Sequence, residues 1–282
     1  MNTKIPFIFF GTPDFAVIIL EELARAGYMP ACIVTAPDKP QGRGLKHTPP
    51  PVKQWAITQN IPVLQPEKIT NESIQQLLNY KADVAIVAAY GFILPESLLS
   101  SFKNGILNVH PSLLPRYRGS SPITTPLLNG DDTTGISIML LDTEMDHGPI
   151  IAQKEIPLTE TITATELSNH LAHEGGKLLV EIIPAWVNGT NVATPQDHTQ
   201  ATYTKKVKKI DGELTDALSP IEKYRHFRAY QGWPGVYMIH PKAGRVKVID
   251  AELQDTNFII KKVIPEGKRE MSYEEFLRGY EK

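Results

Sequence analysis

The sequence predicts an α/β protein with a Rossmann-like, doubly wound and mostly parallel sheet, followed by a second and smaller domain. Short apolar runs alternate with helical patterns up to about residue 186, as they do when helices connect the parallel strands of one sheet. Beyond residue 210 the pattern changes to one short helix and several closely spaced β runs. A chain of 282 residues is long enough for two domains, since a domain commonly holds about 100–200 residues.

Four apolar runs of strand length predict the first half of the sheet. They are Ile5–Phe10, Ala31–Val34, Pro62–Leu64 and Val84–Ala88. The segments between them show helical patterns, and we expect helices at about 14–26, 52–59 and 73–78. In the first of these helices Ala16, Leu20 and Leu23 share one face, which is the spacing of a helix packed on a sheet.

The second half of the sheet and the C-terminal domain follow from the same patterns. Strands are expected at Ile106–Val109, Ile136–Leu140 and Pro149–Ile156, with helices at about 122–128 and 164–186. The last of these helices closes the first domain. In the C-terminal domain we expect a helix at about 220–229 and strands at Val236–Ile239, Val246–Ile249 and Phe258–Lys262.

Composition excludes several classes of protein. Hydrophobic residues make up 41% and charged residues 21%, as in ordinary globular proteins. The single Cys32 excludes a disulfide framework, and the scattered histidines give no metal-ligand spacing, so we expect no metal. The loop after the first strand lacks the G-x-G-x-x-G of dinucleotide sites. With neither a signal peptide nor a run of about 20 apolar residues, we expect a cytoplasmic protein without a membrane partner.

Charge is unevenly distributed along the chain. Residues 201–282 hold 16 basic and 12 acidic residues, a balance of +4. The net charge of the whole chain is −2, so residues 1–200 carry a charge of −6. A basic end on an acidic body fits a polyanionic partner that touches part of the surface. The lysines at 205–209 also fit a solvated linker, and charge alone favours that interpretation.

Two segments carry residues suited to acyl transfer. One runs from Asn108 to Gly119 and reads N-V-H-P-S-L-L-P-R-Y-R-G, and the other, residues 142–148, reads D-T-E-M-D-H-G. Asn108 can donate to a developing oxyanion, His110 can polarise or move a proton, and Asp146 can fix the imidazole's charge and tautomer. Both segments follow strands that should open onto one crevice at the carboxyl ends of the sheet. Taken singly, each residue also has an ordinary structural explanation as a strand-end or turn residue.

The pattern N-x-H-P-S-L-L-P-x-Y-x-G with a later D-x-x-x-D-x-G resembles the 10-formyltetrahydrofolate-dependent formyltransferases. The resemblance implies that Asn108, His110 and Asp146 are catalytic and that 10-formyltetrahydrofolate is the co-substrate. It also implies that the loop from Tyr90 to Leu94 receives the pterin, with Gly91 allowing close approach. The predicted folate-binding residues are Tyr90, Gly91, Phe92, Leu94, Ser112, Leu113, Leu114, Pro115 and Asp142.

The segment 35–46 is long and basic for a routine connection, and such loops are usually functional. Its P-D-x-P-x-G-R-G pattern, with the opening F-G-T-P-D-F, is similar to family members whose acceptor is methionine on initiator tRNA. That resemblance places Arg43 at the acceptor stem, where flanking glycines let it reach into a groove. The predicted tRNA-binding residues are Arg43, Lys46, Lys206, Lys208 and Lys209.

The resemblance extends from Phe10 to Gly279 and includes Trp233-Pro234. It implies an OB-like C-terminal β-barrel, which is shortened here because the chain between Trp233 and the closing segment is shorter than in the family. The expected division is a catalytic domain at 1–188, a basic linker at 189–210 and a shortened OB-like domain at 211–282. Glu144 and His147 also depart from the family and leave the geometry of the Asp146 loop open.

The resemblance implies an enzyme that transfers formyl from 10-formyltetrahydrofolate to the α-amine of methionine on initiator tRNA, and we expect a monomer. One alternative is a formyltransferase acting on an amino sugar or another small amine, against which the Arg43 loop and the lysine run argue. Another is an RNA-binding protein that keeps the fold without catalysis. The intact Asn108, His110 and Asp146 argue against that second alternative.

Overall fold

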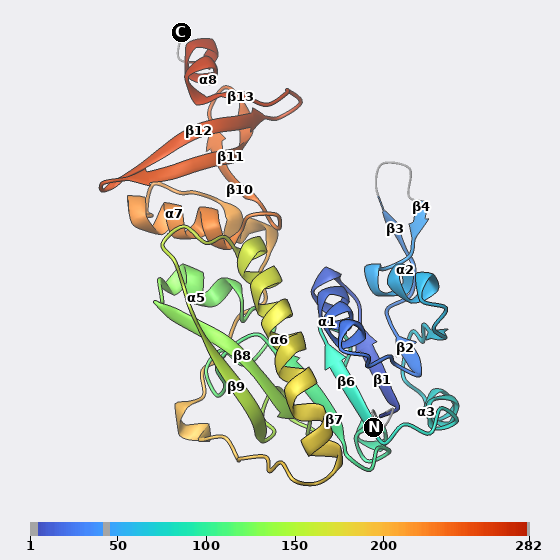
Figure 1. Cartoon of the computed structure of the whole chain (residues 1–282). Helices are drawn as coiled ribbons and strands as arrows, with labels where there is room; N and C mark the ends of the chain where they lie inside the picture. Colours follow the sequence, from blue (N-terminus) through green and yellow to red (C-terminus); the bar gives the residue numbers. More distant parts are fainter. Residues whose placement is uncertain (1–4, 42–45, 281–282) are drawn as a thin grey trace. The chain divides into compact units, whose positions relative to one another are not determined.

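The computed structural model describes residues 5–41 and 46–280 (Figure 1). Packing divides the chain into two compact units. The first holds residues up to 118, 135–156 and 168–203, and the second holds 119–134, 157–167 and the chain from 204 onward. Two internal segments therefore pack with the C-terminal part. The continuous division at 188 and 210 stays a prediction.

A seven-stranded sheet lies at the centre of the first unit, in the order β5-β2-β1-β6-β7-β8-β9 (Figure 1). Its strands are β1 (Phe7–Gly11), β2 (Cys32–Val34), β5 (Val63–Leu64), β6 (Val84–Ala88), β7 (Ile106–His110), β8 (Thr133–Leu140) and β9 (Ile150–Pro157). The strands from β5 to β7 pair in parallel. The Rossmann-like, mostly parallel sheet is thus confirmed.

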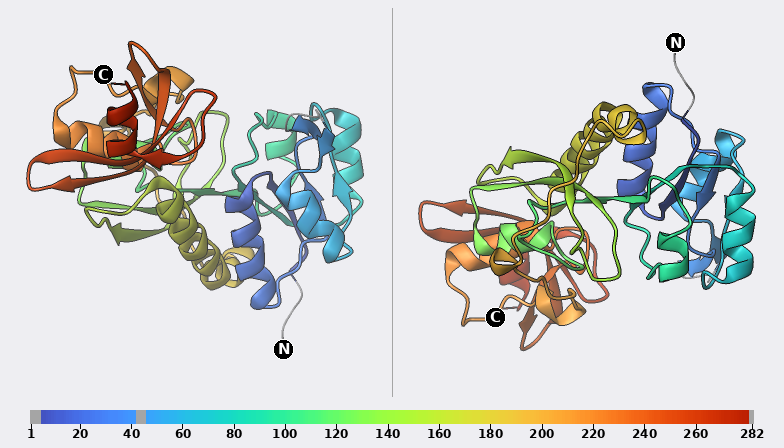
Figure 2. Two further views of the ribbon diagram at one scale, coloured as in Figure 1. Left: turned by 90° about the horizontal axis from the view of Figure 1, so that it is seen from above. Right: turned by 90° about the horizontal axis from the view of Figure 1, so that it is seen from below.

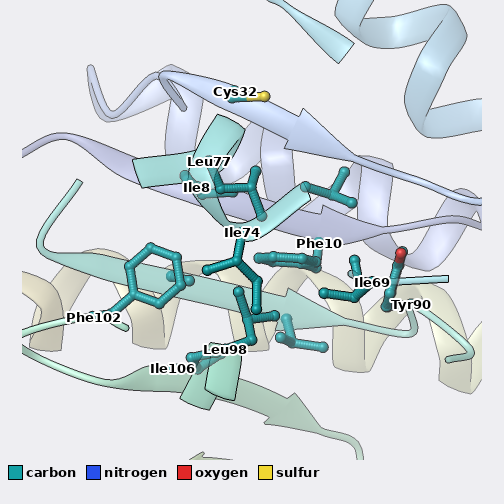
Figure 3. Packing of buried hydrophobic residues seen from close by; sticks show 13 residues of the cluster. Ile8, Phe10, Cys32, Ile69, Ile74, Leu77, Tyr90, Leu98, Phe102 and Ile106 are labelled. Carbon is teal, nitrogen blue, oxygen red and sulfur yellow. The ribbon is translucent and has the colours of Figure 1, made fainter. Parts of the chain in front are cut away.

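Helices cover both faces of this sheet. Successive side chains of a strand point to opposite faces, and the central strands are apolar at successive positions, so both faces are apolar. The helices of this unit are α1 (Asp14–Arg25), α2 (Pro51–Thr58), α3 (Asn71–Leu78), α4 (Glu96–Leu99) and most of α6 (Ala164–Val187). Ile8 and Phe10 pack under Leu77 of α3 and Leu98 of α4 (Figure 3). On the opposite face α1 and α6 lie side by side (Figures 1 and 2), and Nδ1 of His173 is 2.7 Å from Oε1 of Glu22.

The connection between β7 and β8 departs from the simple alternation of strand and helix. β8 pairs antiparallel with β7, with His110 opposite Ser137 and Leu107 opposite Leu140. Helix α5 (Thr124–Asn129) lies between these strands in sequence, but it packs within the second unit. A parallel strand needs a connection that crosses back over the sheet, and the segment 119–134 does not supply one.

Part of the segment 35–46, expected to be a loop, belongs to a short two-stranded sheet. β3 (Lys39–Gln41) pairs antiparallel with β4 (Lys46–Thr48). Strands of three residues with Pro40 in the first give no alternation that sequence patterns detect. Arg43 lies outside the described residues.

The second unit is built on a four-stranded antiparallel sheet. The strands are β10 (Val236–His240), β11 (Gly244–Gln254), β12 (Asn257–Pro265) and β13 (Met271–Ser272), and they pair in this order. The closing helix α8 (Tyr273–Tyr280) packs on this sheet. The core of the unit is formed by Val246 of β11, Val263 of β12 and Phe276 of α8. The smaller antiparallel domain is therefore confirmed, and its strand order leaves β10 and β13 at the two edges.

Helix α7 (Pro220–Ala229) precedes this sheet in the chain. Its start is fixed by a capping box between Ser219 and Glu222, with proline at the first helical position. No helix within residues 5–41 and 46–280 combines the length and apolar character that a membrane crossing requires.

Candidate active site

Asn108 and His110 occupy the last part of β7 and point to the same side of the sheet. Alternate residues of a strand share a face, and Ile106 two positions earlier belongs to the core beneath α3 and α4. Asn108 is 9% exposed and His110 is 4% exposed. The strand therefore holds both polar groups rigidly at the border between the apolar core and the surface.

The imidazole of His110 is bracketed by two groups. Nε2 lies 3.0 Å from the carbonyl oxygen of Tyr117, and Nδ1 lies 3.5 Å from Oδ1 of Asp146. A carbonyl oxygen can only accept a hydrogen bond. Nε2 of His110 therefore carries a hydrogen and donates this hydrogen bond to the carbonyl of Tyr117. Nδ1 is the ring nitrogen that faces a carboxylate.

Both bracketing residues have unusual backbone conformations. Tyr117 has φ of 61° and Asp146 has φ of 51°, in the left-handed region that side chains disfavour. Such conformations persist only where the surroundings impose them, and they gather at functional sites. The convergence expected from the sequence is therefore present for His110 and Asp146, and the backbone on both sides of the imidazole is strained to achieve it.

Asp146 reaches His110 by a different route from the one expected. Because β8 runs antiparallel, its end at Leu140 lies opposite Leu107, near the start of β7. The Asp146 loop, residues 142–148, therefore does not leave from the carboxyl ends of the parallel strands. The rule that placed it there was wrong for this loop, although the loop does bring Asp146 to His110.

The segment Ser112–Pro115 forms hydrogen bonds mainly with neighbouring protein groups, and these stabilise its own turn. Ser112 Oγ donates to the Arg116 carbonyl at 2.6 Å, and Ser137 Oγ donates to the Ser112 carbonyl at 2.6 Å. The amide of Leu114 in turn donates to Ser137 Oγ at 3.0 Å. Ser112 and Leu114 are buried, while Leu113 and Pro115 are half-buried. These contacts shape the turn that presents the Tyr117 carbonyl to His110, and a folate contact by this segment stays a prediction.

The loop after β6 divides into a core part and an exposed part. Tyr90 is buried against Phe10, with ring centroids 5.4 Å apart, and burial raises the pKa of its hydroxyl to about 12. Its side chain is a core group that also packs against Phe92 of the loop, with ring centroids 5.2 Å apart. Gly91 has φ of +85°, and a Cβ there would meet no heavy atom within 4 Å. Phe92 and Ile93 are exposed, with Leu94 half-buried, which leaves an open apolar surface beside the glycine.

Asp142 is engaged at the start of the Asp146 loop. Its Oδ2 lies 2.7 Å from Nδ1 of His147, and its Oδ1 accepts from the amide of Glu144 at 3.0 Å. The ring of His147 stacks on that of His198, with centroids 4.0 Å apart and planes 3° from parallel. The two residues that depart from the family pattern thus anchor this end of the loop to Asp142.

Residues from the segment expected to be a linker complete the site. Gln196 is 6% exposed and donates to the carbonyls of Asp146 and Gly148. Arg118, at 1% exposed, donates to Gln196. Arg118 lies inside the quoted motif, but nothing in the sequence around Gln196 distinguishes it from an exposed linker residue.

The predicted tRNA-binding residues are distributed over both units. Lys46 begins β4, and Arg43 falls outside the part of the chain that the structure describes. Lys206, Lys208 and Lys209 are exposed and belong to the second unit. Their role in RNA binding stays a prediction.

Comparisons with known proteins show the family of this chain. The model of the formyl transferase family matches residues 3–183. The methionyl-tRNA formyltransferase of Chloroflexus aurantiacus is 46% identical over 231 residues, which cover 82% of this chain and 74% of that protein. This chain belongs to the formyl transferase family.

Solved structures show the same fold at low identity. The methionyl-tRNA formyltransferase of Clostridium thermocellum has a TM-score of 0.63 and 15% identity, covering 93% of this chain and 99% of that one. A sugar N-formyltransferase from Shewanella sp. has a TM-score of 0.67 and 16% identity, covering 90% and 100%. The fold is therefore shared by enzymes with different acceptors.

Proposed function

We propose that this chain transfers the formyl group of 10-formyltetrahydrofolate to the α-amine of methionine esterified to initiator tRNA. The approach of Asp146 to His110, on the strand that also carries Asn108, is the observation that carries the proposal. The acceptor is proposed from the 46% identity to a methionyl-tRNA formyltransferase. At that level a shared acceptor is a better explanation than a shared fold alone.

The chemistry follows from the three side chains. The neutral amine attacks the formyl carbon, a C–N bond forms, and negative charge develops on the formyl oxygen. The amide of Asn108 and the imidazole of His110 stabilise this oxyanion. The amine proton passes to the carboxylate of Asp146, the bond between the formyl carbon and N10 of the folate breaks, and N10 takes up that proton, which regenerates the carboxylate. No bond to the enzyme forms in this sequence.

The formyl donor is assigned to the loop after β6. The open space over Gly91 and the exposed Phe92 and Ile93 suit a flat heteroaromatic ring that lies against backbone. The facing boundary is assigned to the turn Ser112–Pro115 and to Asp142. Tyr90 is buried, and its ring supports Phe92 from the core side.

The macromolecular acceptor is assigned to Arg43, Lys46 and the lysines at 206, 208 and 209. Lys206, Lys208 and Lys209 are exposed. Lysines bind phosphates through charge, and a glycine-flanked arginine can enter a groove or stack on a base.

A comparison of acceptors tests the proposal. The purified protein is incubated with 10-formyltetrahydrofolate and either methionyl initiator tRNA, free methionine or a nucleotide-linked amino sugar, and formyl incorporation is measured. We expect incorporation into methionyl-tRNA and at least about 10²-fold less into the other two. Preferred formylation of the amino sugar would replace the proposed acceptor with the one used by the fold neighbour from Shewanella.

A further inference from the structure

We propose that Gln196 and Arg118 are positioning residues that hold the Asp146 loop against His110. The inference rests on the proposed catalytic role of His110 and Asp146. It assigns a task in the reaction to two buried polar side chains that do not touch the reacting atoms. All of these residues belong to the first compact unit.

Gln196 uses both of its N–H donors on the loop. Nε2 lies 2.9 Å from the carbonyl oxygen of Asp146 and 2.7 Å from that of Gly148. These carbonyls flank His147 and belong to a segment without regular backbone pairing. A primary amide is the neutral side chain that offers two donors and an acceptor together, so glutamine suits this task.

Arg118 fixes the orientation of that amide. Its Nε and Nη2 lie 3.2 and 2.7 Å from Oε1 of Gln196. A rotated amide would turn its NH₂ group toward the guanidinium, so only one orientation is compatible with Arg118. Nη1 also donates to the hydroxyl of Tyr203 at 3.3 Å, which restrains the guanidinium in turn.

The same guanidinium supports the other end of the loop. Nη2 of Arg118 lies 2.9 Å from Nδ1 of His198, whose ring stacks on His147. His147 contacts Asp142 at the start of the loop. The loop is therefore held at Asp142 and at Asp146 through one buried arginine.

Arg118 also follows Tyr117 in the chain, and the carbonyl of Tyr117 accepts a hydrogen bond from Nε2 of His110. The two groups that bracket the imidazole are thus connected through a single residue. Asp146 has φ of 51°, a conformation that needs support from its surroundings, and Gln196 binds the carbonyl of that same residue. The hydrogen bonds of Gln196 and Arg118 therefore hold the backbone of the residue whose carboxylate faces His110.

A double-mutant comparison separates positioning from stability. Gln196→Met removes both donors at similar volume, and we expect kcat to fall about 10²-fold while KM for either substrate changes by less than about twofold. In an Asp146→Asn background the same substitution should cause no further loss of kcat. A residue that acts only through the Asp146 carboxylate has no effect once that carboxylate is absent.

A second glutamine provides the control. Nε2 of Gln153 also donates twice, to the Leu114 carbonyl and to Ser137 Oγ, both at 2.8 Å, and neither contact involves the loop. Whatever loss Gln153→Met causes should multiply with that of Asp146→Asn. Gln196→Glu serves as the second variant, since it keeps an acceptor for Arg118 but has no N–H for the loop.

The outcomes distinguish two failures. If Asp146→Asn is slow but the losses from Gln196→Met multiply with it, Gln196 is only a structural residue and the positioning role is overturned. If Asp146→Asn keeps the parental rate, the proposed role of Asp146 fails, and the positioning role fails with it. Should Gln196→Met not fold, the Gln196→Glu variant is judged by the same criterion.

Discussion

The carbonyl of Tyr117 lies 3.0 Å from Nε2 of His110, and this contact commits Nε2 as a hydrogen-bond donor. The other ring nitrogen, Nδ1, lies 3.5 Å from Oδ1 of Asp146. A strand residue and a loop residue are thereby brought together. The turn formed by the motif around His110 supplies the Tyr117 carbonyl.

Asp146→Asn tests the proposed chemistry. The substitution keeps the size of the side chain and removes its negative charge, so His110 loses its carboxylate partner and the amine proton loses its proposed acceptor. We expect kcat for methionyl-tRNA to fall about 10²–10³-fold with little change in KM, since one preorganised electrostatic group contributes about that much. Steady-state kinetics for both substrates measure the change. Near-parental turnover would remove Asp146 from the mechanism.

Gly91→Val tests the assignment of the pterin. The space beside Gly91 is open, so a valine there would stand where the ring is proposed to lie, and KM for folate should rise at least about tenfold. Left-handed backbone makes valine unfavourable by about 1–2 kcal/mol regardless of ligand. Gly189→Val is the control, because Gly189 also has a positive φ of +70° and open space. Both variants should lose similar stability, and an unchanged folate KM in Gly91→Val contradicts the assignment.

Sequence patterns predict the parallel half of the sheet well because buried strands and amphipathic helices are local features. The strand Val84–Ala88 and the start of the helix at Pro220 are predicted at their observed boundaries. The direction of β8 is not predicted, since it depends on α5 packing elsewhere and not on any local pattern. Direction and pairing are long-range properties.

The sequence predicts the candidate site through its charged and polar members and misses its supports. The pairing of His110 with Asp146 is correct because the motif contains both residues. Tyr90 is predicted as a ligand contact, but packing against Phe10 makes its side chain a core group. Gln196 is missed because its burial depends on Arg118, about eighty positions earlier in the chain. Only tertiary contacts distinguish such a glutamine from a linker residue.

Ser137→Ala tests the internal support of the turn at Ser112. The buried hydroxyl of Ser137 donates to the Ser112 carbonyl and accepts from the Leu114 amide. Removal of the hydroxyl leaves both groups without that partner. We expect a destabilisation of about 1–3 kcal/mol in urea unfolding. Thr134→Val on the same strand is the control, since Thr134 Oγ1 is buried without a hydrogen-bond partner among the described residues. Its substitution should leave stability unchanged or raise it.

Glu174 predicts a loss of stability in acid. Hydrogen bonds from Lys154 and Lys177 hold the pKa of Glu174 at about 2, below its ordinary value of 4.5. Its contribution is therefore complete above pH 4.5 and is lost as the pH falls through about 2. Both lysines are half exposed and their charges are screened, so we expect about 1–2 kcal/mol at neutral pH.

Unfolding of Glu174→Gln in urea at pH 7, 4.5, 3 and 2 checks this expectation. The difference in unfolding free energy from the parent should be constant down to about pH 4.5 and shrink toward zero near pH 2. Glu181→Gln, at an exposed position on the same helix, should show no such change. A difference that does not depend on pH would mean that packing, and not charge, explains the role of Glu174.

The macromolecular partner is tested by charge removal in two places. Arg43→Ala should lower kcat/KM for methionyl-tRNA far more than it changes KM for folate, because it removes a positioning contact and no reacting group. Neutralising Lys206, Lys208 and Lys209 together should weaken tRNA binding and flatten its salt dependence. Removal of one lysine–phosphate ion pair lowers the log–log slope by roughly 0.7–0.9, so removal of three lowers it by about 2–3.

A variant with two exposed lysines neutralised at Lys81 and Lys103 is the control for net charge. If binding responds to overall charge alone, each lysine removed there will flatten the slope as much as one removed from the 206–209 run. If the run binds phosphates and Lys81 and Lys103 do not, the control will keep the parental slope, because the slope reflects the number of lysine–phosphate ion pairs. Parental binding and formylation by both the Arg43 and the lysine variants at every salt concentration would contradict the tRNA assignment. A small amine would then be the better acceptor to test.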